Sequence, residues 1–279
     1  MKTTLTAVTG VTGHVGGLVG RHLRDAGAHL VFLARDPARV ADAGGVRVER
    51  ASYADLDAAA SALRGVDVLF MVSGAESVDR VDQHRTVIDA ASAAGVRQVV
   101  YTSFQGASPR AAFTLARDHW ATEEHLRASG MDWTFLRDSL YLDFLPDMVG
   151  ADGVIRGPAG QGRVAAVARA DVARVAASVL LDPAAHAGAT YDLTGPEAFT
   201  LGEAAAVITR VTGRPTSFHD ETLEEAHASR AAYGAPGWQV DAWVSTYTAI
   251  AGGELSRVSD AVERITGTAP MSLEQVLRR

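Results

Sequence analysis

The chain has 279 residues, of which 47% are hydrophobic, a size typical of one large α/β domain or of a nucleotide-binding domain with a small addition. Its formal net charge of -7 disfavours general binding to nucleic acid or to an anionic membrane surface. The absence of cysteine excludes disulfides, thiolate nucleophiles and cysteine-ligated metal centres. The sequence shows no apolar run near the roughly 20 residues of a membrane span and no signal peptide, so it predicts a cytoplasmic protein.

The first predicted element is a buried strand over residues 4–9, which a glycine-rich turn follows directly. This turn, Thr9–Gly16, contains G-x-x-G-x-x-G, and apolar residues recur at helical spacing after it. Gly10 permits the tight turn, Gly13 leaves room for a pyrophosphate near the backbone, and Gly16 allows the helix to pack closely on the strand. The free N–H groups at the helix start would then face the phosphates. The pattern predicts a dinucleotide-binding βαβ unit, with a glycine-rich turn that holds no ligand as the alternative.

Apolar runs of strand length then alternate with amphipathic stretches through the first half of the chain. We predict strands over 4–9, 29–34, 46–51, 66–72, 98–102 and 132–136, and helices that include 79–94 and 117–129. Such alternation is typical of a parallel sheet with helices on both faces, and the handedness of the crossovers favours a doubly wound order. The expected fold class is therefore α/β, with a Rossmann-type doubly wound parallel sheet.

After Asp138 the pattern changes. Glycine and proline cluster between 146 and 162, a helix is predicted over 171–181 with Asp171 as N-cap, a strand over 189–193, and a helix over 201–211 after Thr200; the tail over 221–279 is predicted to be helical with many loops. We expect an NAD(P)-binding domain over 1–150, with 165–182 packing back on it. A small substrate-binding lobe is expected over 183–279. The sequence leaves a monomer and a homodimer open.

The residues after the second predicted strand bear on the choice between NAD and NADP. An acid at this place binds the ribose 2′-OH in NAD sites, whereas a basic group meets the 2′-phosphate in NADP sites. Arg35 follows the strand directly, and Arg39 lies one turn further on. Asp36 precedes Pro37, a pair typical of a helix N-cap and first turn. These residues favour NADPH, read by Arg35, with a solvated surface arginine as the alternative.

Several segments carry a family resemblance: Thr9–Gly16, Ala34–Arg39, Ala51–Asp55, Tyr101–Phe104, Thr122–Thr134 with Leu136 and Arg137, and more loosely Ala168–Ala173 and Tyr191–Gly195. Together they resemble the atypical short-chain dehydrogenases of the NmrA-like branch, and within it the flavin-free NADPH-dependent quinone oxidoreductases of bacteria. The resemblance implies an NADPH-binding Rossmann domain and a small C-terminal lobe that forms the substrate cleft.

The resemblance also implies roles for single residues around the cofactor. Besides Gly10 and Gly16, it places Thr12, Gly13, His14 and Val15 along the pyrophosphate, Ser73 and Gly74 beside the adenosine, Thr102, Ser103 and Phe104 beside the nicotinamide ribose, and Leu136 to Ser139 at the nicotinamide.

The Tyr-x-x-x-Lys pair of most short-chain dehydrogenases is absent. In that pair the tyrosine donates a proton, and the lysine lowers its pKa and holds the ribose. Here Lys2 is the only lysine, so none of the tyrosines has a lysine four residues later. Counted back from residues 130–134, the tyrosine position falls on Leu115 and the lysine position on His119, with Glu123 one turn further. His119 is therefore a candidate to bond the ribose and to supply a proton; a partly exposed histidine paired with Glu123 is the alternative.

Tyr141, just after the sixth predicted strand, is the second candidate for proton transfer; an aromatic wall shared with Phe144 is the alternative. A quinone needs less acid help than a ketone, because hydride addition to it gives an aromatic phenolate. We therefore expect a quinone-like or enone-like small-molecule acceptor. A redox sensor that binds the dinucleotide without turnover, and a reductase or epimerase of a biosynthetic pathway, stay open. Acids and histidines between 219 and 227 resemble metal ligands, but their helical spacing without H-E-x-x-H disfavours a metal site.

Overall fold

The computed structural model describes residues 4–40 and 42–279; Lys2, the only lysine, lies outside them. The chain divides into two compact units. The first comprises Met1–Ser103, Asp118–Arg137 and Ala170–Tyr191, and the second comprises Phe104–Arg117, Asp138–Arg169 and Asp192–Arg279. The predicted division at 150 and 183 is linear, whereas these units interleave along the chain, because several strands and helices begin in one unit and end in the other.

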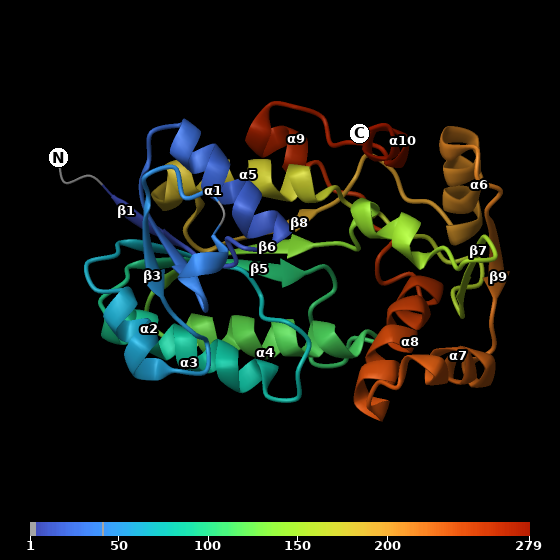
Figure 1. Ribbon diagram of the computed structural model, residues 1–279, viewed down its shortest axis with the longest axis horizontal. Helices are drawn as coiled ribbons and strands as arrows, with labels where there is room; N and C mark the ends of the chain where they lie inside the picture. Colours follow the sequence, from blue (N-terminus) through green and yellow to red (C-terminus); the bar gives the residue numbers. More distant parts are fainter. Residues whose placement is uncertain (1–3, 41) are drawn as a thin grey trace. The chain divides into compact units, whose positions relative to one another are not determined.

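The central sheet contains seven strands in the order β3-β2-β1-β4-β5-β6-β8. Their bounds are β1 Leu5–Val8, β2 His29–Ala34, β3 Arg47–Arg50, β4 Val68–Met71, β5 Gln98–Phe104, β6 Asp132–Asp138 and β8 Ala189–Leu193. The pairs that join β3 to β2, β2 to β1, β1 to β4 and β4 to β5 are parallel (Figure 1). The chain runs outward from β1 in one direction through β2 and β3, and in the other through β4, β5 and β6. This order confirms the predicted doubly wound Rossmann-type fold.

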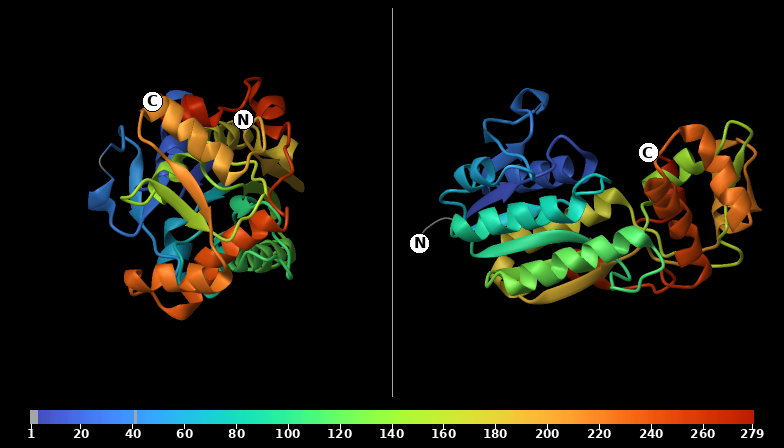
Figure 2. Two further views of the ribbon diagram at one scale, coloured as in Figure 1. Left: turned by 90° about the vertical axis from the view of Figure 1, so that its right-hand side faces the viewer. Right: turned by 90° about the horizontal axis from the view of Figure 1, so that it is seen from below.

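Helices of the first unit cover both faces of the sheet (Figure 1). One face carries α1 (His14–Asp25) and α5 (Arg169–Leu181), and the other carries α2 (Leu56–Ala62), α3 (Arg80–Ala93) and α4 (Thr114–Ala128). Seen from below, α3 and α4 run side by side (Figure 2, right). Helix α1 approaches β2 so closely that a Cβ at Gly20 would lie 3.0 Å from the Phe32 ring.

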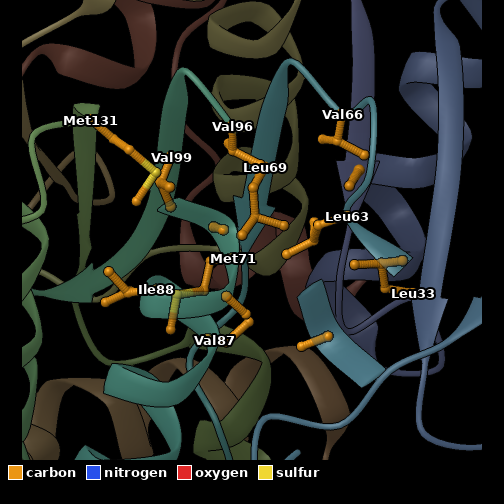
Figure 3. Packing of buried hydrophobic residues seen from close by; sticks show 14 of the residues in the cluster. Leu33, Leu63, Val66, Leu69, Met71, Val87, Ile88, Val96, Val99 and Met131 are labelled. Carbon is orange, nitrogen blue, oxygen red and sulfur yellow. The ribbon is translucent and has the colours of Figure 1, made fainter. Parts of the chain in front are cut away.

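A hydrophobic core beneath α2 and α3 fixes the strand ends. Leu69 and Met71, two residues apart on β4, point to the same face and meet Val99 of β5 and the α3 residues Val87 and Ile88 (Figure 3). All five side chains are buried, and each such burial stabilises the fold by roughly 1.5–3 kcal/mol. The loops after β4 and β5 therefore start from rigid positions.

The second unit has a small sheet and a separate core. Its parallel strands β7 (Val154–Gly157) and β9 (Ser217–Asp220) were not predicted, because they have four residues each and lie among glycines and prolines (Figure 1). Its helices are α6 Leu201–Thr212, α7 Leu223–Arg230, α8 Gly237–Ala251, α9 Ala261–Thr266 and α10 Leu273–Leu277. Thr200 caps α6 in a capping box with Glu203, so the predicted helix start after Thr200 is confirmed.

The predicted start of α5 is wrong by two residues. Asp171 lies in the first turn, fully buried, and pairs with Arg174 at 2.7 Å instead of capping the helix. The amide of Arg169 donates to the carboxylate of Asp143 at 2.8 Å. Asp143 belongs to the 3₁₀ helix η2 (Leu142–Met148). The carboxylate that accepts a hydrogen bond from the first amide of α5 is therefore distant in sequence.

Candidate functional site

The glycine-rich turn joins β1 to α1 in the first unit. Gly10 has φ +65°, in the left-handed region that favours glycine, and Gly13 is the N-cap of α1 without a side-chain cap. The first helical hydrogen bond runs from Gly17 N to Gly13 O, so the amides of residues 14–16 precede it. The first turn of α1 contains no acidic residue. The turn thus offers N–H donors and the positive end of a helix dipole, which fit an anion such as a pyrophosphate.

Two glycines of this turn have different surroundings. A Cβ at Gly16 would lie 2.4 Å from the carbonyl oxygen of Gly10 and 2.5 Å from that of Thr9, so the packing of α1 on β1 requires glycine there. A Cβ at Gly13 would meet Gly10 O at 3.3 Å and nothing else nearby, and Gly13 is exposed together with Thr12 and His14. Gly13 therefore presents a bare, open backbone where a ligand can approach.

Arg35 is exposed directly after β2. Within residues 4–40 and 42–279 its guanidinium has no acidic partner. The next residue, Asp36, caps the 3₁₀ helix η1 (Pro37–Arg39) by accepting from the amide of Ala38 at 3.1 Å. The acid is thus occupied by the backbone, while the neighbouring cation is available to a phosphate group.

Side chains from other elements hold the residues after β4, Val72–Gly74. Tyr53 Oη donates to the carbonyl of Val72 at 2.7 Å, and Thr102 Oγ1 accepts from the amide of Ser73 at 2.8 Å. At Gly74, His84 Nε2 accepts from the amide at 2.8 Å, and Arg80 Nε donates to the carbonyl at 3.0 Å. Ser73 and Gly74, predicted beside the adenosine, therefore lie in a loop with a fixed backbone.

His84 links this loop to α4. Because an amide can only donate, Nε2 accepts from Gly74; we therefore assign the ring proton to Nδ1, which donates to Thr122 Oγ1 at 2.8 Å. Thr122 Oγ1 donates in turn to the carbonyl of Asp118 at 2.8 Å. Burial, together with the nearby Arg80, lowers the pKa of His84 to about 3. The ring is thus neutral at physiological pH and connects the loop to the helix.

His119 is buried on α4, 5% exposed, so the partly exposed histidine considered above is ruled out. Its Nε2 lies 3.0 Å from Arg80 Nη2, and its Nδ1 lies 2.9 Å from Tyr101 Oη. A guanidinium only donates, so Nε2 accepts and Nδ1–H donates to Tyr101. Burial, and next the charge of Arg80, lower the pKa of His119 well below its usual value. A neutral ring is a poor proton source near neutral pH; the contact to the ribose stays a prediction.

Glu123, one turn beyond His119, is fully buried and ion-paired. It accepts from Ser103 Oγ at 2.6 Å, from Arg137 Nε and Nη2 at 2.8 and 2.7 Å, and from Arg127 Nη2 at 3.2 Å. Ser103, predicted beside the ribose, is thus oriented by a buried carboxylate. Since two arginines and a hydroxyl converge on it, Glu123 fixes the end of β5 against α4 and β6.

Leu136, predicted at the nicotinamide, and Phe104, predicted beside its ribose, are packing residues. Leu136 is fully buried on β6. The ring of Phe104 lies 4.9 Å from that of Phe113, within the core of the second unit. Their contacts to a cofactor stay predictions.

In the second unit, Asp138, Ser139 and Tyr141 stand together at the end of β6. Tyr141 Oη donates to Asp138 Oδ2 at 2.7 Å, and the Arg169 guanidinium lies 5.1 Å from the Tyr141 ring centroid. Burial raises the pKa of Asp138 to about 7; burial, then the charge of Asp138, raise the pKa of Tyr141 well above its usual value. Asp138 Oδ1 and Ser139 Oγ are buried and have no hydrogen-bond partner among the described residues.

The sequence did not reveal Arg80 or His84 as parts of these networks, and it placed Asp138 only within the range Leu136–Ser139 at the nicotinamide. Arg80 and His84 are charged or polar residues on a helix whose partners come from α4, so no local pattern marks them. Asp138 carries a weak signal, because it is an acid at the end of a largely apolar strand. Tyr53 lies in one of the family segments, but its link to the loop after β4 depends on the fold.

The acids and histidines between 219 and 227 have structural partners. Glu221 pairs with Arg230 at 2.8 Å, and Glu225 completes a capping box with Thr222. In the part of the chain that the structure describes, no group of such side chains is arranged to hold a metal ion. Across the same residues, no helix combines the length and apolarity that a membrane crossing needs.

The chain is similar in sequence and in fold to known proteins. The sequence model of the NAD(P)H-binding family matches residues 10–183. Quinone oxidoreductase 2 of Escherichia coli K12 is 34% identical over 276 residues, 96% of either chain. A Streptomyces griseus protein named (4-alkanoyl-5-oxo-2,5-dihydrofuran-3-yl)methyl phosphate reductase is 39% identical over 228 residues, 80% of this chain and 79% of its own. A crystal structure of the Escherichia coli NADPH-dependent quinone oxidoreductase with NADPH is similar with a TM-score of 0.90 and 32% identity, covering 98% of both chains.

Proposed function

The chain belongs to the NAD(P)H-binding family, in the NmrA-like branch, and from this premise we propose that it is an NADPH-dependent reductase of a quinone or a similarly activated carbonyl compound. The observation that carries the proposal is the start of α1, where bare Gly13 and three amides before the first helical bond form a phosphate-binding turn. Quinone oxidoreductase 2, a relative that matches 96% of this chain, is named for the same chemistry.

In this proposal the cofactor is NADPH, which supplies the hydride when it is bound. Thr12, Gly13, His14 and Val15 line the pyrophosphate, with Gly10 and Gly16 shaping the turn, and Arg35 binds the 2′-phosphate. The fixed loop of Ser73 and Gly74 lies against the adenosine. Thr102, Ser103, Phe104 and His119 orient the nicotinamide ribose, and Leu136 and Ser139 contact the nicotinamide.

The acceptor in this proposal is one that needs little protonation during hydride transfer. The chain has no Tyr-x-x-x-Lys pair, and the residue at the lysine position, His119, is buried and neutral. A quinone suits such a site, because its reduction gives a stabilised phenolate. The name of the Streptomyces relative describes a ring alkene conjugated to carbonyl groups, a second acceptor of this class. Tyr141 is the proposed proton donor where an acceptor requires one.

A second candidate function is a redox sensor that binds NADPH without turnover. The observation that favours it is the state of His119, whose two ring nitrogens contact Arg80 and Tyr101 and whose pKa lies well below its usual value. A helix without its usual proton relay can still hold a dinucleotide. The two functions share one binding site and differ only in turnover.

Binding and turnover measured on one preparation separate the two functions. NADPH fluorescence reports binding, and the loss of NADPH absorbance with a panel of quinones and conjugated enones reports reduction. The reductase is expected to bind NADPH and to oxidise it with at least one acceptor, while Gly13→Val abolishes both signals. Binding without oxidation by any acceptor would favour the sensor.

A further inference from the structure

We propose that Asp138 is a positioning residue that holds a proton behind Tyr141, so that the two side chains together deliver a proton to the reduced acceptor. This inference rests on the proposed reductase function. It assigns a proton-holding role to Asp138, for which the family resemblance implied only a place at the nicotinamide.

The pair is held in place from both sides. The backbone carbonyl of Asp138 accepts from the amide of Gln105 at 2.8 Å, which fixes it beside the end of β5. Tyr141 forms a parallel bridge with Val167, and the next amide, that of Leu142, donates to the Val167 carbonyl at 2.9 Å. With both backbones fixed, the two side chains start from defined positions, and Tyr141 Oη lies 2.7 Å from Asp138 Oδ2.

The charges around the pair explain why Asp138 can keep a proton. Arg169 lies over the face of the Tyr141 ring, and Asp143 accepts from the Arg169 amide, so these two groups face the tyrosine. Gln105, whose backbone contacts Asp138, is neutral. Among the described residues no cation pairs with Asp138, and its Oδ1 has no hydrogen-bond partner. A buried carboxyl in these surroundings favours its neutral form, and its pKa is about 7.

Two coupled proton transfers, from Tyr141 to the acceptor and from Asp138 to Tyr141, accompany the reduction. In the protonated pair, the Asp138 O–H donates to Tyr141 Oη, and the Tyr141 O–H points to the acceptor oxygen. Hydride addition shifts an electron pair of the acceptor's conjugated double bonds onto that oxygen. The Tyr141 O–H bond then breaks toward the oxygen, and the Asp138 O–H bond breaks toward Tyr141 Oη. Tyr141 ends as a phenol, Asp138 ends as a carboxylate, and water restores the proton.

These proton transfers determine how turnover depends on pH. Below the pKa of Asp138 the pair holds two protons, one of which is available to the acceptor. Above it, the carboxylate accepts the hydrogen bond from Tyr141 and retains that proton, as in the geometry observed. Turnover of an acceptor that needs protonation is therefore expected to fall as the pH rises through about 7.

The test compares kcat against pH for the wild type, Asp138→Asn, Tyr141→Phe and the control Asp143→Asn, with NADPH and a conjugated enone. We expect the wild-type kcat to fall above about pH 7, and Asp138→Asn and Tyr141→Phe to lose this dependence and about 10²-fold or more of kcat at low pH. Asp143→Asn keeps an oxygen that can accept from the Arg169 amide and is expected to keep the wild-type profile. With a quinone the losses are expected to be smaller.

A second measurement is independent of turnover. The infrared band of a protonated carboxyl group is expected to disappear as the pH rises through about 7, to be missing in Asp138→Asn and to persist in Asp143→Asn. The inference is overturned if the band is absent, or if active Asp138→Asn or Tyr141→Phe keeps the wild-type pH profile. If the wild-type protein fails to oxidise NADPH with every acceptor tested, the proposed function is contradicted. The relay is then contradicted as well, whatever the infrared band shows.

Discussion

At the scale of single residues, Arg35 is the proposed determinant of the preference for NADPH over NADH. It is exposed, has no acidic partner among the described residues, and stands beside an aspartate that is occupied as a cap. Arg35→Ala is expected to weaken NADPH binding by roughly 1–3 kcal/mol, the range of a hydrogen bond to a charged group, and to leave NADH nearly unchanged. Fluorescence titration with both cofactors checks this, with exposed Arg64→Ala as the control. Equal losses for both cofactors would refute the role of Arg35.

Substitutions at Gly13 and Gly16 are expected to have different effects, one on NADPH binding and the other on stability. Gly13→Val is expected to abolish NADPH binding by filling the space over the pyrophosphate, while the fold survives, because its Cβ would meet one backbone oxygen at 3.3 Å. Gly16→Ala is expected to destabilise the protein itself, since its Cβ would lie 2.4 Å from Gly10 O. Thermal unfolding and NADPH titration of both variants separate the effects. Normal NADPH affinity in folded Gly13→Val would place the phosphates elsewhere.

At the scale of elements, His84 ties the loop after β4 to α4 only while its ring is neutral. Its pKa is about 3 in the fold and about 6.5 in an unfolded chain. Between these values the unfolded chain binds the extra proton, so the stability present above about pH 6.5 is lost as the pH falls, by up to about 1.4 kcal/mol per pH unit. His119, whose pKa is also lowered, acts in the same direction.

The matching variant is His84→Gln, which keeps a polar side chain but cannot be protonated. Urea unfolding between about pH 7 and pH 5 is expected to show a shallower loss of stability in this variant than in the wild type, by the slope of one proton. Parallel curves for the two proteins would mean that His84 is protonated in the folded state.

The elements that the sequence predicted well are those with a local signal. The strand, glycine turn and helix at the N-terminus, the strand over 189–193 and the helix after Thr200 each have apolar periodicity or a cap, and the structure contains them. The misplaced start of α5 has a different cause, because its first amide bonds to Asp143, more than one element away. Strands β7 and β9 lack a long apolar run and depend on each other for pairing.

At the scale of the whole molecule, the order of the sheet could be predicted but the contents of the candidate site only in part. The glycine turn and Arg35 follow strand ends, so their neighbourhood can be inferred from a parallel sheet. The partners of His119 come from β5 and α3, and the partner of Tyr141 is an acid at a strand end, so both depend on tertiary packing. Burial then changes the proton affinity of both side chains, which sequence spacing alone does not indicate.

The proposed function requires that this site catalyses hydride transfer from NADPH. The most direct test mixes the protein with NADPH carrying deuterium at the transferred position and with a quinone, and follows a single turnover by NADPH absorbance. We expect oxidation of bound NADPH with one hydroquinone formed per NADPH, a slower reaction for the deuterated cofactor, and no reaction in Gly13→Val. Tight NADPH binding with no oxidation by any quinone or conjugated enone would contradict it.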